Sequence, residues 1–194
     1  MKISKEKAAD NRRALVKAAA KLFKEKGIDG VGVAEISKEA GLTHGALYAH
    51  FASKEALAAE ALEYSLARGY AMLTPDGAAR PVTLNELYDY YLSTRQRDSL
   101  SGGCAMTAAA SEIARQDESV SARFTEGFMR MAGYLEGQLA DTDSQLDKRE
   151  RALTMLSAMI GGVAVSRAVL KADPALSDEI LAAMRKLVGE LSDG

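Results

Sequence analysis

Apolar residues recur every three to four positions along almost the whole chain, which is the pattern of amphipathic helices. The first stripe contains Leu15 and Leu22 and ends at Gly27. Residues 1–11 are polar, so we expect this helix to begin near residue 11. Three basic residues of the helix are expected to turn outward, away from the apolar stripe: Lys17, Lys21 and Lys24.

Helix-start signals organise the remainder of the chain. Ser53 is a good N-cap for a helix to about residue 73, and a capping box from Thr83 to Glu86 starts a helix to about residue 97. Apolar stripes predict further helices over residues 104–115, 119–139, 146–170 and 177–191, the last capped by Ser177. We therefore predict an all-α fold of about nine helices with no sheet.

The segment over residues 36–54 predicts two short helices broken at Gly41. Glycine takes the left-handed backbone conformation that ends a helix sharply, and the Thr43 hydroxyl is placed to cap the second helix. Gly45 keeps the start of that helix slim enough for a DNA major groove, which is about 12 Å wide. This pattern predicts a helix-turn-helix in a three-helix unit, with a core of Leu15, Leu22, Phe23, Ile36, Leu47 and Phe51.

Residues 41–55 read Gly-Leu-Thr-His-Gly-Ala-Leu-Tyr-Ala-His-Phe-Ala-Ser-Lys-Glu. This segment resembles the DNA-binding signature of the TetR/AcrR repressors, Gly-Val-Ser-x-Gly-x-Leu-Tyr-x-His-Phe-x-Ser-Lys-Glu. The resemblance extends over about the first sixty residues. One departure is the segment 31–33, Val-Gly-Val, where the family usually has Thr or Ser, so one hydroxyl contact to phosphate is missing. The resemblance implies a homodimeric, ligand-responsive transcriptional regulator, most often a repressor of a palindromic operator.

We expect the DNA contacts to divide into two groups. His44, Gly45 and Ala34 would face the bases, and the phosphate backbone would be held by Thr43, Tyr48, Lys54 and, as a helper, His50.

Charge is distributed unevenly between the two ends of the chain. Residues 1–54 hold eleven Lys and Arg against six Asp and Glu, a net +5, whereas the remainder holds fourteen against twenty-one, a net −7. A basic unit suits a polyanion such as DNA, although charge alone fits a solvated basic face equally well. We assign residues 1–54 to a DNA-binding domain and 55–194 to an effector-binding and dimerisation domain, joined by the continuous helix after Ser53.

Between residues 153 and 165 the chain is apolar around most of a helix circumference, so this helix needs cover on more than one side. The resemblance implies that the helices near 146–170 and 177–191 meet their copies in a four-helix dimer interface. The alternative is that the first of these helices is the centre of a single large core. Gly161 and Gly162 indicate that another backbone comes close there.

Aromatic residues and methionines in the middle of the chain either fill a core or line an adaptable apolar pocket. The resemblance implies that a small effector binds among these helices, shifts the helix after Ser53 and separates the two DNA-reading units. The candidate pocket residues are Tyr64, Tyr88, Tyr91, Cys104, Met106, Phe124, Phe128, Met131, Met155 and Met159. Cys104 is either a small buried residue, which we favour, or a thiol activated by a helix N-terminus, since some members of the resembling family sense electrophiles or oxidants through a thiol.

The sequence lacks the residue patterns that several classes of function require. The only histidines are His44 and His50, six positions apart, and no nucleophile elbow, phosphate-binding loop or dinucleotide fingerprint is present, so we predict no metal, no cofactor and no enzyme. A single cysteine excludes an internal disulfide. The N-terminus lacks a signal peptide, and the apolar run 152–165 falls short of the ~20 residues of a spanning helix. We therefore expect a cytoplasmic protein with no membrane partner.

The competing interpretation is an α-helical ligand-binding or protein-interaction module that does not bind DNA. Salt dependence separates the two, because affinity for DNA falls steeply as salt rises.

Overall fold

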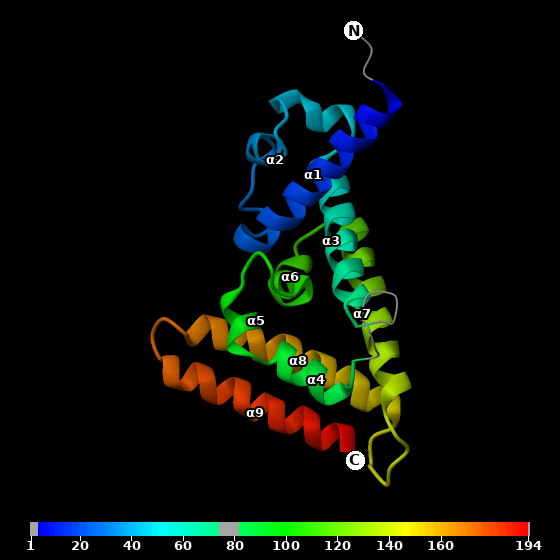
Figure 1. Cartoon of the computed structure of the whole chain (residues 1–194), viewed down its shortest axis with the longest axis vertical. Helices are drawn as coiled ribbons and strands as arrows, with labels where there is room; N and C mark the ends of the chain where they lie inside the picture. Colours follow the sequence, from blue (N-terminus) through cyan, green and yellow to red (C-terminus); the bar gives the residue numbers. More distant parts are fainter. Residues whose placement is uncertain (1–3, 74–81, 194) are drawn as a thin grey trace.

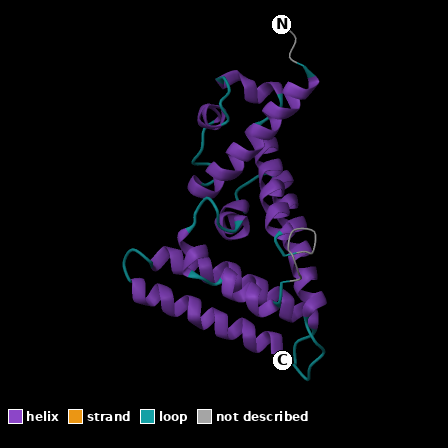
Figure 2. Cartoon of the chain, viewed as in Figure 1, coloured by secondary structure: helices purple, strands orange, loops and turns teal. Residues whose placement is uncertain are grey.

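The computed structural model describes residues 4–73 and 82–193, and Figure 1 shows the course of the chain through them. Within these two ranges every regular element is helical, as Figure 2 shows. The elements are nine α-helices and one 3-10 helix. The prediction of an all-α fold is therefore confirmed.

The upper part of the molecule is a small unit of three elements, α1 (Lys5–Lys26), α2 (Val33–Glu39) and η1 (His44–Ala49), which we call the N-terminal unit. All six residues predicted for its core are buried: Leu15, Leu22, Phe23, Ile36, Leu47 and Phe51. The predicted start of α1 near residue 11 is wrong. The helix begins at Lys5, because the Ser4 hydroxyl accepts a hydrogen bond from the Lys7 amide and caps a polar but helix-competent first turn.

The turn between α2 and η1 follows the prediction in its first half and departs from it in the second. Gly41 has a φ of 69°, the left-handed conformation that only glycine adopts readily. However, the Thr43 side chain makes no capping hydrogen bond, so that part of the prediction is wrong. The segment from His44 is a 3-10 helix of only six residues that contains Gly45, a poor helix former, so the tighter turn replaces an α-helix.

A long helix, α3 (Lys54–Ala71), runs from the N-terminal unit into the lower part of the molecule beside α7 (Glu118–Gln138), as Figure 1 shows. The predicted cap is confirmed, since the Ser53 hydroxyl accepts from the Ala56 amide at 3.1 Å. At Gly127 of α7 a Cβ atom would lie 2.5 Å from Leu66 Cδ1. The close approach of α3 and α7 therefore depends on a glycine at this position.

The lower part is completed by α4 (Leu84–Tyr91), α5 (Thr94–Asp98), α6 (Ala105–Ile113), α8 (Lys148–Val169) and α9 (Pro174–Asp193). The capping box at Thr83 is present, but the single helix predicted over 84–97 is broken, because the Ser93 hydroxyl caps a new helix at the Gln96 amide. The predicted cap Ser177 instead lies inside α9, fully buried, and donates to the Ser166 carbonyl at 2.8 Å. The α9 helix begins earlier, at Pro174.

Among the described residues, α8 is the one helix long and apolar enough to cross a membrane by length and composition. It has 22 residues, more than the apolar run predicted from the sequence. Its buried positions pack against neighbouring helices, and at Gly162 an added Cβ would lie 2.6 Å from Met184 Cγ on α9. Packing within the single chain therefore accounts for part of the apolar composition of α8, since 44% of its apolar window is buried and Val165 is 51% exposed.

A buried arginine fixes the lower end of the α8 and α9 pair. Arg151 is 1% exposed, and its guanidinium donates to the carbonyls of Leu191 and Ser192, each at 2.7 Å, and to the carbonyl of Ala140 at 3.1 Å. It also donates to the Thr142 hydroxyl at 3.0 Å. One side chain thus ties the last turn of α9 and the loop after α7 to α8.

Replacing this arginine should weaken the fold. We expect Arg151→Leu to lower the free energy of unfolding by about 3 kcal/mol, because several backbone carbonyls lose a charged donor in a buried site. Arg149→Leu is the matched control on the same helix: its side chain is exposed, so the change should stay within about 0.5 kcal/mol. Urea denaturation at equal protein concentrations measures both, and equal losses would contradict the role given to Arg151.

Candidate functional site

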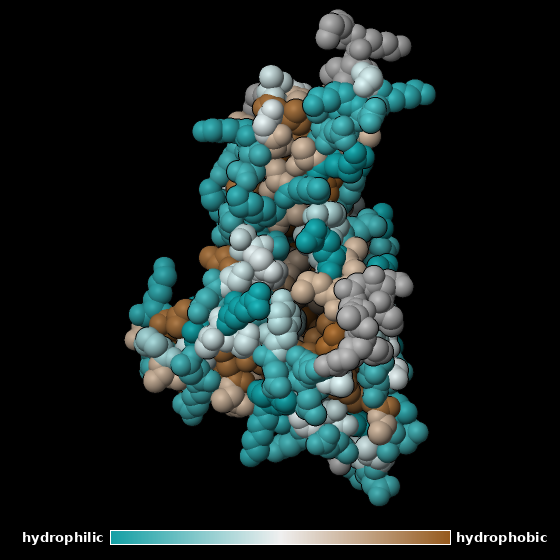
Figure 3. Space-filling model, viewed as in Figure 1, coloured by the Kyte–Doolittle hydropathy of each residue, from teal (hydrophilic) through white to brown (hydrophobic). Residues whose placement is uncertain are grey.

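The outer face of the N-terminal unit presents the turn from α2 to η1. Thr43 and Gly45 are exposed there, Tyr48 is 61% exposed, and Ala34 is exposed on α2. His50 and Lys54 are half-buried at the end of η1 and the start of α3. The backbone of His44 begins η1, but the placement of its side chain lies outside the described structure. Figure 3 shows hydrophilic residues over most of the upper part of one face of the molecule.

This surface is held on α1 by ionic contacts. Lys21 forms an ion pair with Glu39 at 2.7 Å, and Lys26 forms one with Glu35. Side chains of α1 therefore contact both the first turn and the last turn of α2. The hydrogen bond from Lys21 to Glu39 raises the pKa of that lysine above its ordinary value. Such exposed pairs each contribute little to stability, but together they fix the orientation of α2 on α1.

Arg12 connects the end of η1 to α3. Its guanidinium lies 4.5 Å from the centroid of the Phe51 ring and forms an ion pair with Glu60 on α3. A cation over an aromatic face is attracted by the ring's negative face. The residue after η1, Phe51, is therefore in contact with Arg12 of α1, which is in turn paired with Glu60 of α3.

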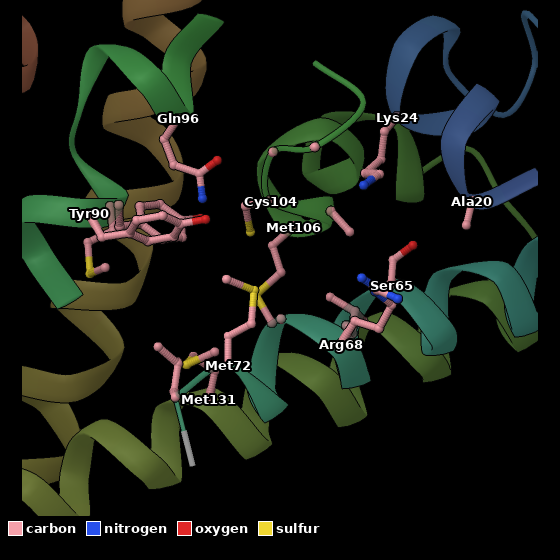
Figure 4. Close-up of a pocket in the computed structure, with 18 of the residues that line it drawn as sticks. Ala20, Lys24, Ser65, Arg68, Met72, Tyr90, Gln96, Cys104, Met106 and Met131 are labelled. Carbon is pink, nitrogen blue, oxygen red and sulfur yellow. The ribbon is translucent and has the colours of Figure 1, made fainter. Parts of the chain in front are cut away.

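A cavity of about 410 Å³ lies where α1, α3, α4, α6, α7 and α8 meet, and Figure 4 shows its lining side chains. Six of the ten residues predicted for a ligand pocket line it: Tyr64, Tyr91, Cys104, Met106, Met131 and Met159. Tyr91 is buried and its hydroxyl is within 2.9 Å of the Thr107 hydroxyl. Burial raises the pKa of Tyr91 well above its ordinary value, so its hydroxyl stays protonated.

The other four predicted residues lie elsewhere. Tyr88 is buried on α4, where the Arg185 guanidinium sits 5.3 Å from its ring centroid, and Met155 is buried on α8. Phe124 and Phe128 stack on each other along α7 with ring centroids 6.3 Å apart. None of the four lines the cavity.

Sequence reasoning missed the basic part of the cavity lining. Lys17 and Lys21 are exposed, as expected, but they also border the cavity. Lys24 was expected to turn outward as well, and it is half-buried in the cavity lining. Loss of water around its ammonium group lowers the pKa of Lys24. The spacing i, i+4, i+7 places the three on one helix face, which was the available signal. The residues that close the space above that face come from distant parts of the chain. Also missed were Arg68, Met72, Tyr90 and Gln96.

The short helix α6 extends from this cavity to the N-terminal unit. At its start, Cys104, Ala105 and Met106 line the cavity, and the Cys104 side chain makes no capping hydrogen bond. Near its other end, the Glu112 carboxylate accepts a hydrogen bond from the Asp29 amide at 2.9 Å. This contact lies in the loop between α1 and α2, so α6 touches the cavity and the N-terminal unit at once.

A metal centre has no basis in the described part of the chain, where no group of three or more His, Cys, Asp or Glu residues gathers. Cys104 is half-buried in the cavity wall with no disulfide partner.

Comparison with known proteins agrees with this arrangement. A family described as "Bacterial regulatory proteins, tetR family" matches residues 15–61, and one described as "Tetracyclin repressor-like, C-terminal domain" matches residues 79–184, more than half of the chain. The chain is 30% identical over 176 residues to the HTH-type transcriptional regulator LmrA of Bacillus subtilis, covering 86% of this chain and 92% of that protein.

Solved structures show the same fold. A TetR-family regulator from Cytophaga hutchinsonii superposes with a TM-score of 0.75 at 21% identity, covering all of both chains. The reduced form of E. coli NemR superposes with a TM-score of 0.74, also at 21% identity, over 93% of this chain and 96% of that one. Family match, relatives and fold agree, and the chain therefore belongs to the TetR family of DNA-binding transcriptional regulators, which are not enzymes.

Proposed function

We propose that this protein is a repressor that binds a palindromic operator as a homodimer and is released by a small effector bound in the cavity. One observation carries the proposal: α1 packs against the helix-turn-helix formed by α2 and η1, and it also supplies side chains to the cavity lining. A ligand in that space touches the N-terminal unit directly.

Reading of DNA is assigned to the exposed turn. Thr43, Tyr48 and Lys54 hold phosphates with His50 as a helper, and His44, Gly45 and Ala34 face the bases. The exposure of Tyr48 and the absence of a side-chain cap at Thr43 support this, because both hydroxyls remain available to a partner. Residues 1–54 then form the DNA-binding domain and residues 55–194 the domain for effector and dimerisation.

Dimerisation is assigned to α8 and α9. Each presents an apolar or small-residue face to solvent in the single chain, including Val165 at 51% exposure, Leu176 and Leu187. On the same face of α8, Gly161 has open space where a Cβ would be, which leaves room for the backbone of a second copy. Two-fold symmetry of the dimer would match a palindromic site.

Release is assigned to α3 and α6. The N-terminal unit is braced on α3 through Arg12 and Glu60 and on α6 through Glu112. A ligand that fills the cavity favours the arrangement of these helices that fits it best, and DNA favours the arrangement that fits the operator. If the two arrangements differ, each ligand weakens the binding of the other by the same factor.

Substitutions on the DNA-reading turn should separate the two kinds of contact. The test uses duplexes selected from a random pool by the purified protein. Lys54→Ala should weaken binding to all duplex sequences alike and reduce the slope of log affinity against log salt by about one. Tyr48→Phe should also weaken all sequences alike, whereas His44→Ala should change the preferred base at one position of each half-site. Fluorescence anisotropy across a salt series measures this. Absence of any duplex binding at low salt would refute the proposed function.

A charge placed on the exposed face of α8 should separate the two copies. We expect Val165→Glu to convert the protein from a dimer to a monomer at micromolar concentration, because two buried carboxylates would face each other across the symmetry axis. Leu100→Glu is the control, since Leu100 is equally exposed but lies in the loop before α6. Sedimentation velocity distinguishes the outcomes, and a monomeric wild-type protein would contradict the assignment.

Loss of the α6 contact should uncouple the cavity from the DNA-reading turn. In Glu112→Ala the Asp29 amide loses its acceptor, so we expect a cavity ligand found by thermal-shift screening to bind with unchanged affinity but to release operator DNA less effectively. Ser111→Ala, an exposed neighbour on the same helix, should keep the full response. Equal release from both variants would exclude Glu112 from the coupling.

A further inference from the structure

Among the described residues that line the cavity, the charged side chains are all basic. They are three lysines and one arginine, namely Lys17, Lys21, Lys24 and Arg68, and no described aspartate or glutamate joins them. Lys21 is already paired with Glu39. The other three positive charges have no carboxylate partner among the described residues, so the lining is left electrostatically unbalanced.

Lys24 is the most informative of these residues. It is half-buried and forms no hydrogen bond or ion pair with another described residue. A partly desolvated ammonium group without a partner is costly, and an anion beside it would remove that cost. Arg68 is exposed at the rim, where its guanidinium donates to the Tyr64 hydroxyl at 3.2 Å and has further donors that no described residue accepts from.

The N-terminus of α6 adds a third positive element. Its first residues form part of the cavity wall, and the side chain of its N-cap residue, Cys104, makes no capping hydrogen bond. The positive end of a helix dipole favours negative charge close by. Lys24 from α1, Arg68 from α3 and this helix end therefore converge from three separate elements.

The remaining lining is apolar and adaptable. Figure 4 shows Lys24 and Arg68 at one side of the cavity and Met72, Met131 and Tyr90 at the other. Leu135, Leu156 and Met159 continue the apolar part, and methionines adjust to irregular shapes. A ligand that matches both regions has an anionic group at one end and an apolar body.

We propose that the effector cavity takes an organic anion with an apolar body, its negative group held by Lys24 and Arg68 and its body among the methionines. This inference rests on the proposed function for the identity of the cavity, and it adds the chemical class of the ligand. The anion would join α1 to α3, so the ligand contacts the DNA-binding domain itself. Cations of the same shape are rejected by like charge.

Three probes with the same ten-carbon chain test the class: decanoate, 1-decanol and decyltrimethylammonium. Isothermal titration of each into the full-length protein should give the tightest binding for decanoate, on the order of tenfold tighter than the alcohol, and the weakest for the cation. Equal or tighter binding of the alcohol or the cation overturns the proposal, and so does the absence of binding by all three.

Substitutions locate the anion. Lys24→Gln should weaken the binding of decanoate on the order of tenfold and leave the binding of 1-decanol unchanged. Arg68→Gln should weaken decanoate binding by a smaller factor, because solvent screens the charge at the rim. Unchanged binding of the alcohol shows that the cavity is intact. Lys7→Gln on the same helix is the control, since Lys7 is exposed and outside the lining. Decanoate affinity that is insensitive to Lys24 overturns the assignment. None of these titrations contains DNA, so duplex binding tests the regulator separately.

Discussion

The contact between α3 and α7 at Gly127 is the constraint on which the arrangement depends. With no side chain at that position, Leu66 lies directly against the backbone of α7, and α3 is held close along its lower half. Its upper half carries Leu57, Ala58 and Ala61 into the core shared with α1. One helix therefore belongs to two packed regions without a linker between them, and neither region can tilt without disturbing the packing of the other.

This continuity explains where the cavity lies. It lies at the junction of the two regions, where α1 and α3 face the helices of the lower part and α6 lies between α1 and α8. Cavities at such junctions are common binding sites because side chains from several elements meet there. In this chain the junction brings basic residues of the N-terminal unit against methionines of the lower helices, and neither group alone would define a ligand.

The sequence predicted the features that depend on local chemistry. Gly41 ends α2 as expected, Ser53 and Thr83 cap their helices, and the six core residues of the N-terminal unit are buried. Some local signals were misjudged, since Thr43 does not cap η1 whereas Ser4 and Ser93 cap helices that were not predicted to start there. Other predictions were wrong because a contact distant in sequence determines the outcome. Ser177 resembles a cap but hydrogen-bonds to α8, and Lys24 resembles a solvated lysine until α3 and α6 are placed beside it. Helical spacing separates the polar from the apolar face of a helix, but it does not show which polar face borders a cavity.

The hydrogen bonds of Arg151 have a mechanical consequence for the regulator. They join the final turn of α9 to α8 at one end, while Ser177 and Arg97 join the two helices at the other, where Arg97 donates to the Ser177 hydroxyl at 2.9 Å. With both ends fastened, sliding of α9 along α8 is opposed, and the pair behaves as one rigid base. In the proposed dimer, a change in the distance between two DNA-reading turns must then originate above this base, in the helices that border the cavity.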